Sequence, residues 1–143
     1  MSTYFAQILA RIESRMPELR QIGVAAGLEQ AVDALRAYPS VFLYQPSESA
    51  AENENLDGVL QQVTDRFGVL IAVRDLSDAR GEAALRQIDV LRRDLKAALL
   101  GSWEDPTDVP PETIEYQGGS LAYAKDGTLI WLDNFISHHL ERA

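Results

Sequence analysis

The chain has 143 residues and a formal net charge of −9, from 22 acidic and 13 basic side chains. This length fits one domain with a substantial core. The acidic balance disfavours binding to nucleic-acid phosphates or anionic membranes, although DNA could pass such a surface without sticking to it. The absence of cysteine excludes disulfides and thiolate metal sites. The sequence predicts neither a secretory signal nor a membrane span.

The first part of the chain is predicted to alternate helices and strands. The first helix is predicted because apolar side chains recur at three- and four-residue steps, and Pro17 ends it. Pro39 and Pro46 bound a short apolar run, as is typical of a strand. In chain order we expect a helix over residues 3–16, a weak strand at 19–24, a short helix at 28–38 and a strand at 41–44.

Residues 47–57 are polar and acidic, and they contain almost nothing to bury. Such a composition cannot offset the entropy of ordering, so it predicts a mobile acidic surface loop. The alternative is a partner-binding loop that becomes ordered on assembly. Glu52 and Glu54 are the acidic side chains that this loop would offer to a partner.

Residues 59–74 form an unusually long strand pattern. Apolar side chains occupy one face of a period-two alternation, which Asp65 interrupts. Strands are usually about 3–10 residues long. Either this strand therefore bends near Gly68, or its first half extends beyond the body of the sheet.

Residues 79–100 give the best helix pattern in the chain. Asp78 is expected as the N-cap, and Gly101 as the glycine just after the last turn. The opposite, solvated face carries many charges, among them Arg86, Arg92 and Arg93. The apolar stripe consists of Leu85, Ile88, Leu91, Leu95 and Leu99.

Three strands are predicted to close the chain, at residues 113–116, 120–125 and 128–137. Gly118-Gly119 would turn between the first two, and Asp126-Gly127 is a strong hairpin signal between the last two. His138 and His139 would lie in a surface tail. Adjacent strand residues point to opposite faces, so this pair is a poor metal site.

No residue pattern indicates catalysis. The glycines form no phosphate-binding loop, no Gly-x-Ser-x-Gly elbow is present, and the acidic pairs lie in expected turns. We therefore predict no catalytic, cofactor-binding or metal-ligating residue, and no enzyme. Trp131 is expected in the core. Trp103 is expected to cover the core after the long helix, with its indole N–H at the surface, and an interface role is the alternative.

Together these elements predict an α+β fold. We expect a single domain over residues 1–143, with a mainly antiparallel sheet flanked by an N-terminal helix and a long central helix. The apolar alternation over residues 67–73 and 129–135 requires a sheet face on which helices pack.

In this order the elements resemble the tail terminator, or tail completion, proteins of long-tailed bacteriophages. That family places an N-terminal helix, a strand, a long strand and a long helix before a Gly-Trp-like corner and a C-terminal antiparallel unit. Ser102 stands between Gly101 and Trp103, where many relatives run glycine directly into tryptophan. The matching stretches are residues 5–16, 41–44, 67–73, 85–100, 101–103 and 116–135.

The resemblance implies a structural virion protein. Terminators form a ring, usually of six subunits, at the head-proximal end of the tail tube. The ring stops tube polymerisation and offers a docking face to the head-side connector. The implied partners are other copies of the chain, the tube protein and the connector, with assembly in the host cytoplasm. DNA would pass through the ring without specific binding, and neither a cofactor nor a membrane is implied.

Two other classes of function stay open at this point. The chain could be another phage head–tail joining or tail-assembly protein, or a bacterial small-molecule-binding domain or enzyme. If it forms a ring, each subunit must present two different, complementary surfaces. The candidate interface residues are Glu52, Glu54, Asp65, Arg66, Arg86, Arg92, Arg93 and Trp103.

Overall fold

The computed structural model describes residues 3–77, 80–101, 103 and 114–142. Within these residues the chain forms three helices and a five-stranded sheet. The helices are α1 (Thr3–Arg15), α2 (Leu28–Ala34) and α3 (Glu82–Leu99). The strands are β1 (Gln21–Ala25), β2 (Ser40–Ala50), β3 (Leu60–Arg74), β4 (Glu115–Lys125) and β5 (Thr128–Arg142).

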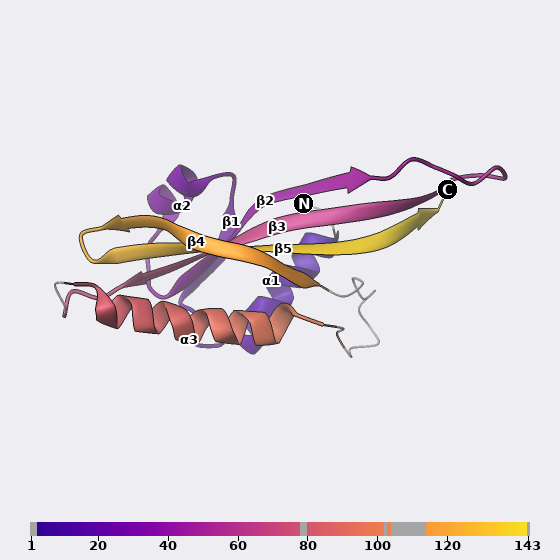
Figure 1. Cartoon of the computed structure of the whole chain (residues 1–143). Coiled ribbons are helices and arrows are strands. Elements are labelled where there is room, and N and C mark those ends of the chain that lie inside the picture. Colours follow the sequence, from indigo (N-terminus) through magenta and orange to yellow (C-terminus); the bar gives the residue numbers. More distant parts are fainter. Residues whose placement is uncertain (1–2, 78–79, 102, 104–113, 143) are drawn as a thin grey trace.

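The sheet has the strand order β1-β2-β3-β5-β4 (Figure 1). β1 is parallel to β2, and the other neighbouring pairs are antiparallel. The predicted α+β class with a mainly antiparallel sheet is therefore confirmed. The two outer strands differ in length and neighbour, so the two edges of the sheet are not alike.

Helices cover both faces of the sheet, but unequally. α1 and α3 pack against each other and against one face, and the short α2 covers the other face. Successive strand residues point to opposite faces, so each strand contributes to both cores. The main core includes Ile8, Ile12, Leu43, Phe67, Ile71, Ile88, Leu95 and Phe135. The smaller core includes Ala31, Phe42, Leu70, Ala72 and Ile130.

The long strand β3 extends beyond the body of the sheet. Its C-terminal half lies among the helices, and its N-terminal half projects past them between the outer parts of β2 and β5 (Figure 1). A bulge interrupts β2 between Tyr44 and Ser47, opposite Gly68 and Arg66 of β3. Bulges bend a strand and increase its twist, and this one marks the start of the projection.

Three strand boundaries differ from the predicted ones. β2 continues to Ala50, so residues 47–50 of the expected loop pair with β3. Gly118-Gly119 is not a turn, because this segment pairs along β5 and forms part of β4. β5 continues to Arg142, so the two histidines lie in a strand and not in a tail. Each of these strand boundaries depends on pairing with a neighbouring strand, so it cannot be predicted from local composition.

The two internal helices are shorter than predicted. α2 ends at Ala34, and α3 begins at Glu82 with Gly81 as its N-cap. The expected cap, Asp78, lies outside the described residues. Gly101 follows α3 with a φ of 84°, as predicted for a glycine just after a helix.

One residue of the predicted stripe on α3 is wrong. Leu85 is 41% exposed, and Ala84 takes the buried position at that turn. The buried positions that follow are Ile88, Leu91, Leu95, Ala98 and Leu99, and Ala84 matches their helical spacing. The pattern assigns Leu85 to the stripe because leucine is more hydrophobic than alanine. In the structure the smaller side chain, Ala84, is the one that faces the core.

The β4–β5 hairpin is confirmed. Asp126 has a φ of 52° and Gly127 a φ of 80°, the left-handed pair that a two-residue turn of this kind requires. Glycine is also needed at the second position because a Cβ there would clash with the side chain of Leu76. The turn is thus set both by backbone conformation and by the segment that follows β3.

Candidate assembly interface

The outer parts of β2, β3 and β5 form a three-stranded projection, which we call the arm. It comprises residues 47–50, 60–66 and 136–142 (Figure 1). The guanidinium of Arg66 donates to Ser49 Oγ at 3.0 Å on the exposed face of the arm. Asp65 points to the other face and is only 1% exposed. The arm therefore presents Arg66 to solvent, whereas Asp65 is part of the subunit interior.

Residues 51–59 join β2 to β3 at the end of the arm, and we call them the arm tip. The side chain of Asn53 holds this turn together. Its Oδ1 accepts a hydrogen bond from the Leu60 backbone N–H at 3.0 Å, and its Nδ2 donates to the Gly58 carbonyl at 3.0 Å. The charged and apolar side chains point outward. The exposed residues of the tip include Glu52, Glu54, Leu56 and Asp57.

Three arginines line an open hollow of about 720 Å³ near the end of β3 that lies farthest from the arm. Arg20 precedes β1, Arg36 follows α2 and Arg74 ends β3, and all three are exposed. None of them forms an ion pair within the described part of the chain. We call this site the basic hollow. The other residues that line it are Ala37, Tyr38, Asp75 and Leu76.

The one carboxylate in the lining of the basic hollow is held by its own turn. Ser77 donates to Asp75 Oδ1 from its hydroxyl at 2.6 Å and from its backbone N–H at 2.8 Å. These hydrogen bonds lower the pKa of Asp75, because they favour the ionised form. Asp75 is therefore charged at neutral pH and bonded to Ser77, and it forms no ion pair with the arginines among the described residues. Arg36 donates from Nη1 to the Asp33 carbonyl at 2.9 Å and to the Leu35 carbonyl at 3.1 Å, so its other guanidinium nitrogens are the ones available to a partner.

A buried carboxylate fastens α3 to β4 and β5. Asp133 on β5 is fully buried and accepts hydrogen bonds from Arg92 Nε at 3.0 Å, the Tyr116 hydroxyl at 3.0 Å and Trp131 Nε1 at 2.9 Å. Arg92 also lies over the Trp131 ring, 4.4 Å from its centroid. The Lys96 ammonium lies 3.9 Å from the centroid of the Tyr116 ring. A buried charge is tolerated when it is paired and hydrogen-bonded, as it is here.

The electrostatics of this cluster fix its protonation state at neutral pH. Desolvation acts to lower the pKa of Arg92, but the hydrogen bond and charge of Asp133 outweigh it, so the net shift is upward. Desolvation and Asp133 together raise the pKa of Tyr116 against the opposing effect of Arg92. Arg92 is cationic, Tyr116 is neutral, and the Arg92 side chain is only 19% exposed.

Gly119 makes room for the Asp133 cluster. A Cβ at this position would clash with Asp133 Oδ1 and would lie 2.7 Å from Trp131 Nε1. Trp131 itself was predicted to lie in the core. It is partly buried and packs against the main core. The close approach of these side chains to β4 explains a glycine that the sequence suggested was part of a turn.

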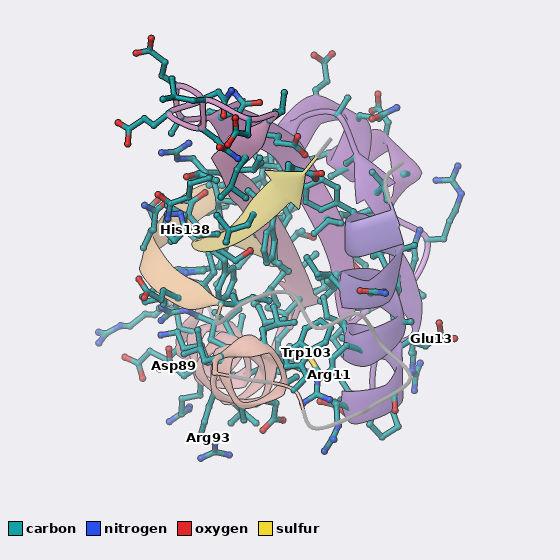
Figure 2. The ribbon with its side chains drawn as sticks, turned by 90° about the vertical axis from the view of Figure 1, so that its right-hand side faces the viewer. Arg11, Glu13, Asp89, Arg93, Trp103 and His138 are labelled. Atoms are coloured by element: carbon teal, nitrogen blue, oxygen red, sulfur yellow. The ribbon has the colours of Figure 1, made fainter. Side chains whose placement is uncertain are left out.

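Trp103 joins the C-terminal end of α3 to α1. Figure 2 shows Arg11 beside Trp103, and the guanidinium carbon lies 4.8 Å from the ring centroid. Arg11 also donates from Nε to the Ala98 carbonyl at 2.8 Å. Trp103 is buried, as predicted, but its indole N–H is not at the surface. It donates to the Leu99 carbonyl at 3.2 Å, because the ring lies back over the last turn of α3.

The family model described as phage tail terminator protein matches residues 1–143. The chain belongs to the phage tail terminator family. This confirms the resemblance read from the sequence, and it makes the chain a structural virion protein of bacteriophage tail assembly. No curated protein matches the sequence.

In this member of the tail terminator family, the candidate interface residues fall into two groups. Asp65, Arg92 and Trp103 are engaged or buried inside the subunit, so they are not available to a partner in this conformation. The exposed candidates are Glu52, Glu54 and Arg66 on the arm, and Arg86 and Arg93 on α3. Figure 2 shows Arg93 pointing away from α3 into solvent. Glu52 and Glu54 thus lie in the arm tip, Arg66 lies at the base of the arm beside Ser47, and Arg86 and Arg93 lie on the separate surface of α3.

No local sequence pattern predicts the basic hollow or the Asp133 cluster. The arginines of the hollow belong to three different elements, and no local pattern links them.

Among the described residues, no group of three or more His, Cys, Asp or Glu side chains could hold a metal ion. No helix in the described part of the chain has both the length and the apolar character needed to cross a membrane.

Proposed function

We propose that this tail terminator family member forms a ring, of six subunits as the resemblance implies, at the head-proximal end of the phage tail tube. The ring stops tube polymerisation there and offers a docking face to the head-side connector. Family membership is the observation that carries this proposal. In this role the protein acts by binding and not by catalysis, it is assembled in the host cytoplasm, and it needs no cofactor.

The shape of the subunit supports a ring. A closed ring requires a heterologous contact, in which two different surfaces of each subunit meet. Among the described residues the subunit has an arm at one end only, and its sheet ends in unlike edges. The net charge of −9 suits a channel through which DNA moves without binding.

Complementation of a phage that lacks this gene tests the proposal. We expect overlong tails that are not joined to heads without the protein, and tails of normal length attached to heads when the wild-type chain is supplied. Electron microscopy of purified tubes mixed with the protein should show a cap on one end. Tails of normal length that fail to join heads in the deletion would favour another head–tail joining protein. A wild-type chain that never caps tubes would contradict the proposal.

We further propose that the exposed candidates contribute to the ring or to its attachment. Arg66, Glu52 and Glu54 would act from the arm, and Arg86 and Arg93 from α3. Exposed charge pairs are worth roughly 0–1 kcal/mol each, so they mainly set register and association rate. Arg66→Glu should therefore weaken assembly without unfolding the subunit, and a melting curve would separate the two effects.

A further inference from the structure

The arm tip and the basic hollow lie at opposite ends of the same long strand. β3, whose course Figure 1 shows, begins just after the tip at Leu60 and ends at Arg74, which lines the hollow. A strand of this length spans roughly 50 Å at about 3.3 Å per residue. The tip therefore cannot reach the hollow of its own subunit, and any contact between the two must join different copies of the chain.

The charges of the two sites are complementary. The arm tip contains three acidic side chains, Glu52, Glu54 and Asp57, and no basic one. The basic hollow presents Arg20, Arg36 and Arg74, all exposed and without an ion pair within the described residues. Arginine forms bidentate hydrogen bonds with carboxylates, so it suits recognition of glutamate and aspartate. In a chain with an excess of acids, a site lined by three arginines is where an acidic segment can be received.

The apolar features of the two sites are also complementary. Leu56 in the tip is 100% exposed, and Leu76 in the hollow is 69% exposed beside Ala37 and Tyr38. An apolar side chain surrounded by charged ones matches the layout of an interface, in which an apolar core is enclosed by a polar rim. Burying Leu56 against Leu76 and Tyr38 would remove both leucines from water.

We propose that the arm tip of one subunit docks in the basic hollow of the next copy of this chain. Leu56 enters the hollow, while Glu54 and Asp57 pair with Arg20, Arg36 and Arg74. This contact joins unlike surfaces at opposite ends of the subunit, which is the heterologous kind of contact that a ring requires, and the ring forms when the rotation between neighbours closes. The inference rests on the proposed ring and names the residues that hold it together.

Disulfide crosslinking tests this docking directly, because the chain has no cysteine of its own. The double variant Leu56→Cys/Leu76→Cys is supplied to a phage that lacks the gene, and purified virions are then oxidised. We expect a ladder of covalent multimers on a non-reducing gel. The control, Leu56→Cys/Asp89→Cys, places its second cysteine at an exposed position of α3 that has no proposed interface role, and it should stay monomeric.

The outcomes separate this inference from the proposed function. If virions form normally but neither variant crosslinks, or both crosslink equally, the docking is overturned and the ring proposal stands. If the tip crosslinks to the tube protein instead, the arm binds the tube and the inference is again overturned. If the wild-type chain does not restore tails, the proposed function itself fails.

Charge reversal provides a second test, which does not depend on oxidation. Glu54→Arg/Asp57→Arg and Arg20→Glu/Arg74→Glu should each lower the yield of joined tails about tenfold or more. The variant that combines all four changes should recover most of that loss, because the charges are complementary again. Glu13→Arg, on the exposed side of α1, serves as the control and should have no effect (Figure 2). Failure of the combined variant to recover, when each double variant still folds, would contradict the docking.

Discussion

The Asp133 cluster and the basic hollow are two sites built around arginine, and they use it in opposite ways. Arg92 pairs with a buried carboxylate, lies over the Trp131 ring and donates to the Tyr116 hydroxyl, so its charge is satisfied within the subunit. Arg20, Arg36 and Arg74 surround an open hollow and form no ion pair within the described residues. The comparison teaches that an arginine on a charged helix face can be part of the framework, whereas arginines scattered through the sequence can form a binding surface.

The body of the subunit should account for the largest effects on stability. Leu95→Ala removes a fully buried side chain from the main core, and we expect a loss of about 2–5 kcal/mol in unfolding free energy. Leu85→Ala, on the same helix but 41% exposed, should cost less than about 1 kcal/mol. Chemical denaturation measures both. Equal losses would mean that α3 does not pack as described.

The Asp133 cluster should come next. Asp133→Asn keeps the shape of the side chain but removes the charge that pairs with Arg92, and we expect a loss of about 2–3 kcal/mol. The partial exposure of Arg92 lets water reach it, which limits the cost. Asp89→Asn, an exposed change on α3, is the matched control and should have an effect within about 0.5 kcal/mol. A similarly small loss for both variants would show that the Asp133 cluster contributes no more to stability than an exposed carboxylate does.

Gly119→Ala should destabilise the same cluster from the side of β4. The added methyl group would clash with Asp133 and crowd the Trp131 nitrogen, so we expect a loss of about 1–3 kcal/mol. Gly23→Ala in β1 is the control, because its Cβ would lie 3.4 Å from the nearest Phe42 atoms, an ordinary contact. Thermal melting of the two variants decides whether glycine is required at this point of the sheet.

The sequence predicted those parts of the molecule that depend on local pattern. Periodicity located α1 and most of α3, the alternation located β3, and Asp126-Gly127 located the hairpin. It could not predict that β2 and β5 continue along the arm, because their outer residues are polar and become strands only by pairing with β3.

The Asp133 cluster and the basic hollow depend on tertiary structure more than the helices and strands do. Arg92 follows the charged pattern of an exposed helix face, and only the position of Asp133 on β5 shows that its charge is used internally. The arginines of the hollow come together through two strand pairings. β1 runs parallel to β2, which places Arg20 beside the start of β2, and β2 runs antiparallel to β3, which places Arg36 near Arg74 at the end of β3. No spacing along the chain encodes either arrangement.

The stability of the subunit at alkaline pH should depend on Tyr116 of the Asp133 cluster. The pKa of Tyr116 is raised in the folded state by desolvation and by Asp133. Its contribution is therefore fully present below the unfolded-state pKa of about 10. It is lost as pH rises through the folded-state value, because the unfolded chain releases this proton first. Tyr116→Phe should make the loss above about pH 10 shallower in melting curves. An unchanged slope would show that Tyr116 does not titrate in the cluster.

The arm tip should have the smallest effect on the stability of the isolated subunit. Leu56 is fully exposed, so Leu56→Ala should change the unfolding free energy by no more than about 0.5 kcal/mol. The composition of residues 47–57 predicts mobility, and amide exchange should be fast at the tip and slow in the body strands of the isolated subunit. Assembly should slow exchange at the tip, because docking buries Leu56. A loss of more than about 1 kcal/mol in Leu56→Ala, or strong protection of the tip in isolated subunits, would show that the tip packs within its own subunit. In that case Leu56 would be part of the subunit's own packing, as the Asp133 cluster is, and would not be an exposed residue available for docking.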